Sequence, residues 1–338
     1  MSEKYPIDFV VTWVDGNDPV WQAEKAKYSP NKNADNRNVR FRDWDNMQYW
    51  FRAVEKFAPW VNKVHFVTYG HLPKWLNTNN PKLNIAKHSD FIPKEYLPTF
   101  SSQPIELNLH RIKGLAERFV YFNDDMFLLR PVKRELFFAG KDCLPTDFAI
   151  TSTISTTTKE DMMPFIKLNC VTILNGHFDK KEQMKKHFSK WVNLAYGWNA
   201  LRNLIFYGQH RFKGFANNHL AFSFLKSEYE DIWEKEYEAL ADTSSHKFRS
   251  KLDLDNWLIR YWQLTRGNFY PIGRHVKGKV YEIYNGVEQN QELFKVIENQ
   301  TMPMICINDN DNVDFEPMKE RIKQAFDKIL PEKSSFEK

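Results

Sequence analysis

Residues 118–125 read RFVYFNDD, an apolar run that ends in one amide and two carboxylates. A similar run, IDFVVTWV at residues 7–14, ends in the polar turn Asp15-Gly16-Asn17-Asp18. Short runs of β-branched and aromatic residues that are bounded by turn residues are typical of buried strands. The two runs therefore predict buried strands whose carboxyl ends open into acidic turns.

The sequence between these two runs alternates between helix and strand patterns. Apolar residues recur at helical spacing over residues 45–58, whereas residues 63–69 (KVHFVTY) and 83–87 resemble strands. Residues 101–104 (SSQP) predict a helix start, because a hydroxyl cap precedes a proline in the first turn. The buried face of that helix is expected to contain Ile105, Leu109, Ile112 and Ala116.

This alternation favours an α/β fold with a mostly parallel sheet. In such sheets, ligands bind beyond the carboxyl ends of the strands. Asp15, Asp124 and Asp125 all follow predicted strands directly. We therefore expect these three carboxylates to share one cleft.

The second half of the chain is predicted to be mainly helical. Residues 146–174 contain two strand-like runs around a Ser/Thr-rich stretch. Helical spacing then dominates residues 181–207, about 219–240 and 253–264, and an amphipathic helix is expected at 315–329.

The halves are not separated by a Gly/Pro/Ser-rich linker. We therefore predict one composite domain over residues 1–312. Its α/β core lies at 1–135, and a strand insertion and helical half at 136–312 complete the site. A C-terminal amphipathic helix and tail follow at 313–338.

The composition excludes several classes of protein. A net charge of +5 over 338 residues, spread along the chain without a Lys/Arg block, is too weak for a nucleic-acid-binding protein. It fits a small anionic substrate or contact with an anionic membrane surface. The N-terminus has no signal-like apolar run, and no stretch of about 18 apolar residues occurs. We therefore expect a cytoplasmic protein that does not span the membrane.

The cysteines and the absent motifs narrow the chemistry further. Three widely spaced cysteines suggest neither a disulfide framework nor a thiolate zinc site. The sequence lacks G-x-G-x-x-G, a Walker loop, H-E-x-x-H and G-x-S-x-G. Ten scattered histidines argue against a zinc enzyme. The 15% aromatic content predicts mainly core packing, with a minority of rings stacking on bases or sugars.

The motif Asn123-Asp124-Asp125 is a candidate metal site. Two adjacent carboxylates cannot both stay ionised away from water unless a cation lies close, and divalent ions prefer oxygen ligands. Such an ion would bind diphosphate oxygens and neutralise charge on a leaving group. An ordinary acidic turn is the alternative interpretation.

Glu106 and His110 are candidates for proton transfer. Their spacing of four residues on a predicted helix places them on one face, one turn apart. A carboxylate and an imidazole together can orient a base or accept a proton from a hydroxyl. A surface i,i+4 pair is the alternative.

Arg40, Arg42 and Asp43, together with the distant Arg249, form a candidate phosphate site. Guanidinium groups bind phosphate oxygens in a forked geometry, which suits a nucleotide diphosphate. Solvated surface arginines are the alternative.

Four blocks of the sequence resemble one family. The first is IDFVVTWVDGND at 7–18, and the second and longest spans 40–132, from RFRDWDNMQYW to NDDMFLLRPV. The third comprises GFANNHLAFSF and HKFRSKLDLDNWLIRYWQL at 214–224 and 246–264, and the fourth is ICINDND at 305–311. In this order the blocks resemble the Stealth proteins. These are bacterial polysaccharide phosphotransferases related to the α/β subunit of animal N-acetylglucosamine-1-phosphotransferase.

The resemblance implies a nucleotide-sugar-binding core like that of A-type glycosyltransferases, with a Mg²⁺ or Mn²⁺ ion. It also implies an enzyme that transfers a hexose-1-phosphate or N-acetylhexosamine-1-phosphate from a UDP-sugar to a saccharide hydroxyl. The hydroxyl attacks the phosphorus nearer the sugar, so UMP is released and a phosphodiester forms. The expected setting is capsular, exopolysaccharide or cell-surface polysaccharide biosynthesis.

The same resemblance assigns roles to residues of this sequence. Those matching metal ligands are Asp124, Asp125 and Asp309. Those matching catalytic groups are His219, Glu106, His110 and Arg249. Those matching substrate-binding positions are Thr12, Trp13, Asp15, Arg42, Asp43, Asn123 and Asp253. The sequence leaves open whether His219, His110 or Glu106 accepts the acceptor's proton.

Two positions depart from the family pattern. The third block reads NNHLAF, without the proline expected near His219, and Trp44 replaces a small polar residue. Two other functions stay open: a conventional metal-dependent glycosyltransferase that releases UDP, and a non-catalytic carbohydrate-binding protein. The expected partners are a UDP-sugar and a saccharide acceptor, which can be lipid-linked at the inner face of the bacterial membrane, with peripheral membrane contact and without nucleic acid.

Overall fold

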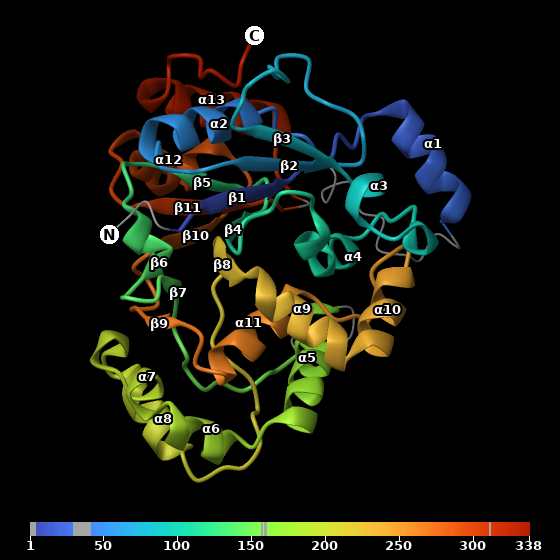
Figure 1. Cartoon of the computed structure of the whole chain (residues 1–338). Helices are drawn as coiled ribbons and strands as arrows, with labels where there is room; N and C mark the ends of the chain where they lie inside the picture. Colours follow the sequence, from blue (N-terminus) through green and yellow to red (C-terminus); the bar gives the residue numbers. More distant parts are fainter. Residues whose placement is uncertain (1–4, 30–41, 157, 159–160, 311) are drawn as a thin grey trace.

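The computed structural model describes residues 5–29, 42–156, 158, 161–310 and 312–338. Its central feature is a five-stranded sheet with the order β3-β2-β1-β4-β8 (Figure 1). The first four of these strands are parallel and β8 runs antiparallel to β4. The strands are β1 (Ile7–Thr12), β2 (Val64–Thr68), β3 (Leu83–Lys87), β4 (Arg118–Phe122) and β8 (Phe222–Leu225). The predicted α/β class with a mostly parallel sheet is confirmed.

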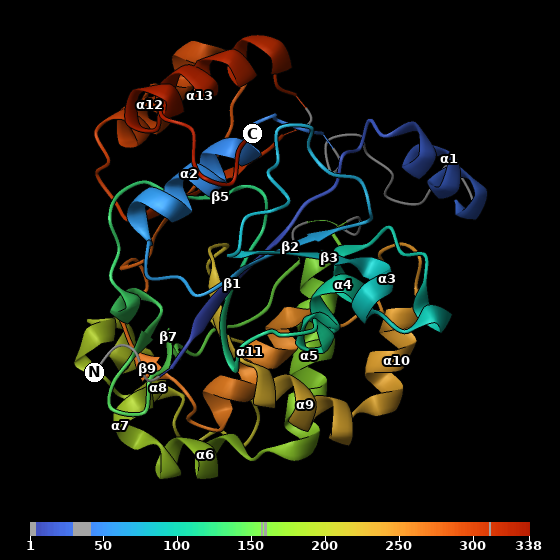
Figure 2. The same ribbon diagram turned by 45° about the horizontal axis from the view of Figure 1, so that its top comes forward.

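Helices cover both faces of this sheet because its strands are apolar on both sides. In β1, Phe9 and Val11 belong to one core cluster and Val10 to the other, as the two-residue period of a strand requires. Figures 1 and 2 show α2, α12 and α13 over one face and α5, α9 and α11 over the other. The first three are α2 (Met47–Phe57), α12 (Gln291–Glu298) and α13 (Phe315–Ile329). The helices over the second face are α5 (Met163–His177), α9 (Lys226–Lys235) and α11 (Asn256–Thr265). Two further helices are α4 (Ser102–Leu107) and α10 (Tyr237–Ser245).

A second, smaller sheet brings the end of the chain back to the acidic turn after β4. It contains β10 (Gly278–Glu282), β11 (Met304–Asn308) and β5 (Met126–Leu128), with β11 antiparallel to β5. The Ile307 amide donates to the Asp125 carbonyl at 2.8 Å. Residues of β11 therefore lie beside residues 124–126, although they are far apart in sequence.

The remaining elements lie at the margins of the fold. A third sheet contains β6 (Phe138–Ala139), β7 (Leu144–Asp147) and β9 (Tyr270–Pro271). The short helices are α1 (Pro19–Tyr28), α3 (His88–Phe91), α6 (Lys180–Lys186), α7 (Phe188–Trp191) and α8 (Asn199–Ile205). Within the described ranges, no helix has the length and apolar character needed to cross a membrane.

Several predicted elements differ from the structure. The second strand-like run of residues 146–174 is largely helix α5, and the predicted helix 181–207 is divided into α6, α7 and α8. Gly197 adopts φ 55°, which interrupts the helical backbone there. The segment 219–240 begins with β8 because its apolar residues pair with the open edge of β4.

The helices predicted at 253–264 and 315–329 are confirmed as α11 and α13. The boundary between 1–312 and 313–338 stays a prediction. The apolar face of α13 nevertheless lies in the same core cluster as β1, and it contains Met318, Ile322, Ala325, Phe326 and Ile329.

A buried carboxylate joins the amino ends of the parallel strands. Asp8 in β1 accepts hydrogen bonds from Asn62 Nδ2 at 2.7 Å and from the Ala116 amide at 2.8 Å, just before β4. His65 Nε2 in β2 lies 2.9 Å from the same carboxylate, and Asn84 Nδ2 in β3 donates to His65 Nδ1 at 2.8 Å. With Nδ1 as acceptor, Nε2 carries the proton and donates to Asp8.

These contacts make Asp8 a source of pH-dependent stability. Burial raises the pKa of Asp8, but the hydrogen bonds from His65, Asn62 and Ala116 outweigh burial and lower the pKa below its ordinary value of 3.8. A carboxyl with a lowered folded-state pKa stabilises the fold above pH 3.8. That contribution is lost as the pH falls through the folded-state pKa.

Replacing Asp8 by Asn should lower the free energy of unfolding by about 1.5–3 kcal/mol at neutral pH, because the buried donors lose their charged acceptor. The variant should also lose stability less steeply than the wild type below pH 3.8. Urea denaturation across the acidic range measures both effects, with Asp242→Asn, whose side chain is 67% exposed, as the control. A variant as stable as the wild type would contradict this role.

Candidate active site

The acidic turn after β4 and the end of β1 leave the sheet at the same edge. The parallel register pairs Val11 with Phe122, so the residues that follow each strand are neighbours. The negative charge of Asp15 acts on Asp43, and that of Asp43 acts on Asp124. Asp15 and Asp124 therefore both lie near Asp43, whereas the expected cleft shared by Asp15, Asp124 and Asp125 stays a prediction, since of these three only Asp124 lines the neighbouring cavity.

This grouping leaves the site with an excess of negative charge. Loss of hydration in the surrounding protein, together with the charges of Asp125 and Asp43, raises the pKa of Asp124 to about 7. Asp43 also has a raised pKa, because of burial and the nearby Asp45 and Asp15 charges. A site of this kind gains stability from a bound cation.

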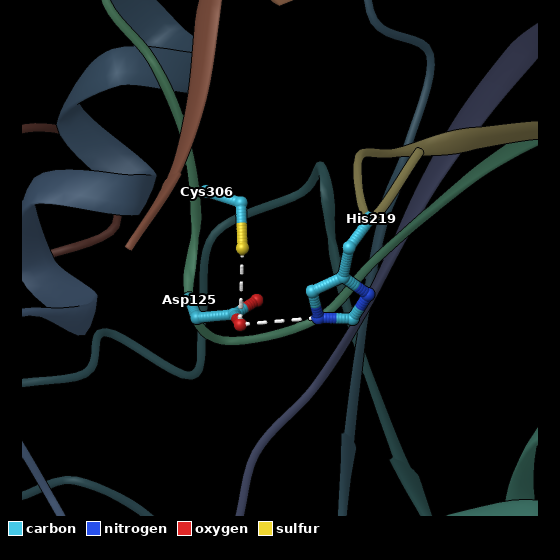
Figure 3. Close-up of side chains that lie close together, drawn as sticks. All are labelled: Asp125, His219 and Cys306. Carbon is cyan, nitrogen blue, oxygen red and sulfur yellow. Dashed lines mark hydrogen bonds and ion pairs between the residues drawn. The ribbon is translucent and has the colours of Figure 1, made fainter. Parts of the chain in front are cut away.

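Asp125 lies at the centre of a cluster of three side chains (Figure 3). His219 Nε2, just before β8, is 3.3 Å from Asp125 Oδ2, and the Cys306 thiol of β11 donates to the same oxygen at 3.2 Å. The potential ligand atoms of these residues all lie within 4.8 Å of one another. Burial lowers the pKa of His219, but the hydrogen bond and charge of Asp125 outweigh burial and raise it.

The residues present fit a divalent cation. Asp125 Oδ1 is buried and has no hydrogen-bond partner within the described part of the chain, so one carboxylate oxygen is available as a ligand. The neighbouring Asp124 supplies further carboxylate oxygens, which Mg²⁺ and Mn²⁺ favour. The sequence did not indicate Cys306. Its one signal was its position in the ICINDND block, three residues before Asp309.

Asp309 lies outside this three-residue cluster among the described residues. Its carboxylate accepts a hydrogen bond from Trp44 Nε1 at 3.0 Å and lies 3.6 Å from Arg42 Nε. The Arg42 guanidinium also packs on the Phe315 ring, at 4.8 Å. The contacts of Trp44 and Arg42 thus hold the segment after β11, and the metal role of Asp309 stays a prediction. Arg40 lies outside the described residues.

Glu106 is buried behind the acidic edge and belongs to the same site. Tyr121 Oη donates to Glu106 Oε1 at 3.3 Å and lies 3.2 Å from Thr12 Oγ1, which links β1, β4 and α4. Burial raises the pKa of Glu106, while the positive charges of Arg249 and His219 lower it. Glu106 therefore lies within electrostatic reach of both predicted catalytic partners.

His110 does not share a helical face with Glu106, so that prediction is wrong. Helix α4 ends at Leu107, and His110 follows in a separate 3₁₀ turn, residues Leu109–Arg111. Its ring stacks on Tyr229 at 5.6 Å, and burial lowers its pKa to about 3. His110 is thus a neutral packing residue in the core beneath the site, and its predicted catalytic role has no supporting contact among the described residues.

Arg249 is positioned by neutral side chains. Its Nη2 donates to Ser102 Oγ at 3.2 Å and its Nε donates to Gln103 Oε1 at 3.3 Å, so α4 holds the guanidinium. Asp253 accepts the Ser250 amide at 2.8 Å and lies 2.6 Å from His246 Nδ1. Asp253 therefore shapes the turn that presents Arg249.

The loop before His219 is held by a buried ion pair. Arg260 of α11 donates from Nε and Nη2 to the two oxygens of Asp147, at 2.8 Å each, and from Nη1 to Asn217 Oδ1 at 2.6 Å. Arg274 Nε also donates to Asn218 Oδ1 at 3.0 Å. These contacts fix the backbone where the expected proline is missing.

A cavity of about 180 Å³ opens beside Asp124. Thr12 and Asn123 line it, and aromatic walls come from Trp13, Trp21 and Phe100.

His88, at the end of β3, also lines this cavity. It is 7% exposed, and its Nδ1 has no hydrogen-bond partner within the described ranges. Burial lowers its pKa to about 3, so the ring is neutral.

Sequence reasoning missed two charged or polar residues of the site besides Cys306. His88 was hidden in a strand-to-loop segment. Lys167 of α5 acts electrostatically on His219 and Asp255 and lies 5.3 Å from the Trp257 ring. The signal for Lys167 was a single lysine within the apolar run PFIKLNC at 164–170.

Comparison with solved structures finds a distant likeness. A galactosyltransferase LgtC, in complex with donor and acceptor sugar analogues, is 10% identical. The match covers 89% of this chain and 86% of that chain, with a TM-score of 0.35.

Comparison by sequence finds much nearer relatives. Residues 5–33 match the Stealth protein conserved region 1 and residues 40–144 match conserved region 2. The capsular polysaccharide phosphotransferase WcwK of Streptococcus pneumoniae is 43% identical, and the receptor polysaccharide phosphotransferase WefC of Streptococcus gordonii is 41% identical. Both matches cover 100% of this chain and 100% of the relative. The chain therefore belongs to the Stealth family of polysaccharide phosphotransferases.

Proposed function

We propose that this enzyme transfers a sugar-1-phosphate from a UDP-sugar to a saccharide hydroxyl and releases UMP. The observation that carries this proposal is an aromatic cavity lined by Asp124. The next residue, Asp125, lies 3.3 Å from His219, and Arg249 donates to Ser102 of the cavity lining. Relatives named for capsular and receptor polysaccharide support a product of that class. The product would be a saccharide that contains a phosphodiester.

The cavity suits the nucleoside half of the donor. The rings of Trp13 and Phe100 offer apolar walls to a base, and His88 Nδ1 offers a buried hydrogen-bonding atom. A uridine held there would extend its diphosphate towards Asp124 and Asp125. When bound to these carboxylates, Mg²⁺ or Mn²⁺ would neutralise the diphosphate and the leaving UMP.

His219 is the proposed general base. Its Nε2 faces Asp125, so its Nδ1, which has no partner in the described residues, is the atom that accepts the acceptor's proton. Asp125 thereby orients the ring, as a carboxylate does for histidine in other acid–base sites. The acceptor oxygen forms a bond to the phosphorus next to the sugar while the bond from that phosphorus to UMP breaks.

Arg249 is the proposed anchor for the phosphoryl group in transfer. Its contacts to Ser102 and Gln103 are with neutral atoms, so its charge is not cancelled by them. The negative charge of Glu106 acts on both Arg249 and His219, so it would stabilise the protonated ring that forms once His219 has accepted the proton. We further propose that the acceptor is lipid-linked and that the enzyme acts at the inner face of the bacterial membrane.

The test is incubation with a panel of UDP-sugars, Mg²⁺ or Mn²⁺ and saccharide acceptors, followed by identification of the nucleotide released. We expect UMP to appear in proportion to a phosphorus-containing saccharide. Release of UDP would identify a conventional glycosyltransferase instead. Saccharide binding without donor consumption would identify a carbohydrate-binding protein.

Loss of His219 and loss of Asp125 should differ in severity. His219→Ala should lower kcat by about 10²–10⁴-fold, the usual contribution of a general base. Asp125→Ala should cost more, because it removes both the carboxylate for the cation and the partner of His219. Initial rates of UMP release measure this, with His210→Ala as the control because that side chain is 66% exposed. Near-normal rates in Asp125→Ala would contradict the assignment.

Changing His88 should affect donor binding more than chemistry. His88→Phe removes the unpartnered nitrogen and should raise the Kd for UMP about tenfold, with kcat little changed. His88→Gln retains polar atoms and should recover part of the affinity. Calorimetric titration with UMP provides the measurement, and unchanged affinity in both variants would place the base elsewhere.

A further inference from the structure

The segment 179–213 projects from the lower end of the molecule in both ribbon views, away from α12 and α13 (Figures 1 and 2). It contains α6, α7 and α8. Among the described residues, six of the fourteen large apolar side chains that are exposed lie within residues 188–205 of this segment. They are Phe188 (45% exposed), Leu194 (97%), Trp198 (87%), Leu201 (46%), Leu204 (43%) and Ile205 (75%).

The same segment accounts for the net positive charge of the protein. It holds six lysines, two arginines and two acidic residues, a net charge of +6, whereas the whole chain has +5. The rest of the chain therefore has a net charge of −1. The expectation of a charge spread along the chain is therefore wrong. The concentration does not form one continuous Lys/Arg block because its residues are divided over three short helices. The exposed basic residues are Lys181, Lys185, Lys186, Arg202, Arg211 and Lys213.

Several hydrogen bonds hold this segment on the rest of the fold. Lys190 Nζ donates to the Phe269 carbonyl at 2.9 Å, and within the segment Lys180 Nζ donates to the Phe206 carbonyl at 2.7 Å, which joins α6 to the end of α8. Asn203 Nδ2 donates to the Ala149 carbonyl at 2.6 Å and its Oδ1 accepts from the Thr151 amide at 2.8 Å. These hydrogen bonds fix the backbone that carries the exposed apolar side chains.

We propose that α6–α8, residues 179–213, form the surface by which the protein binds an anionic lipid bilayer. Exposed Trp and branched apolar side chains close together in one segment are typical of interfacial membrane binding, and exposed Lys and Arg side chains of the same segment can bind anionic headgroups. The proposal rests on the proposed function only for its purpose, which is to bring the site to a lipid-linked acceptor. The binding itself needs no turnover.

Charge decides between this partner and a second copy of the chain. A symmetric dimer through this surface would place one +6 segment against another, and like charges across an interface oppose association. An anionic bilayer complements the charge and also buries the apolar side chains. An anionic bilayer is thus one partner that accounts for both the positive charge and the exposed apolar side chains.

The test is co-sedimentation of the full-length protein with vesicles of phosphatidylcholine alone or mixed with phosphatidylglycerol. We expect binding to the anionic vesicles only, weakened by salt. The double variants Trp198→Ser/Ile205→Ser and Lys185→Gln/Lys186→Gln should each lower the partition coefficient about tenfold or more. Matched controls, Leu252→Ser (73% exposed in the wild type) and Lys74→Gln/Lys295→Gln, should bind as the wild type does.

Two results would overturn the proposal. One is equal vesicle binding by the surface variants and the controls. The other is self-association of the wild type in sedimentation velocity that the same variants abolish, since that would make the surface a dimer interface. UMP release with a short water-soluble acceptor should be unchanged in both surface variants. If the wild type binds vesicles but releases no UMP, the proposed function is refuted, whereas the proposed lipid-binding surface is not.

Discussion

The parallel pairing of β1 with β4 is the constraint on which the site depends. It aligns Val11 with Phe122, and the residues beyond both strands therefore meet at one edge of the sheet. The buried Asp8 carboxylate fixes the amino ends of the same strands through His65, Asn62 and Ala116. Asp8 thus joins the amino ends of the strands, whereas the acidic turns follow their carboxyl ends.

The electrostatics of the acidic edge support the proposal that a cation and a diphosphate bind there. Burial, together with the charges of Asp125 and Asp43, raises the pKa of Asp124 to about 7, and a nearby cation would favour its ionised form. The positive Arg249 is held by α4, and the loop before His219 is held by Arg260, which pairs with Asp147 and donates to Asn217. A phosphoryl group between these two signs of charge would be stabilised during transfer.

Local sequence pattern predicted the parts of the fold that local forces decide. The strands at 7–14 and 118–122 are short apolar runs that end in turn residues, the helix at 315–329 has a clear amphipathic period, and each is present in the structure. Helix α5 was misread because its apolar residues are nearly continuous and no amphipathic period was visible. β8 was misread because its pairing with the open edge of β4 is a tertiary event.

As with the fold, only part of the site could be predicted from the sequence. Residues at strand ends, such as Asp124 and Asp125, follow from topology. Cys306 and Lys167 do not, because β11 and α5 reach the site by long-range packing. The prediction that His110 and Glu106 share a helical face assumes one continuous helix, but helix α4 ends at Leu107.

The central claim, attack at phosphorus, is tested most directly by the bridging oxygen of the donor. A UDP-sugar labelled with ¹⁸O between the sugar's anomeric carbon and its phosphorus would be turned over with a saccharide acceptor. If the acceptor hydroxyl attacks phosphorus, the label stays in the saccharide product and mass spectrometry finds none in the released nucleotide. Label recovered in released UDP would mean attack at carbon, and would contradict the account.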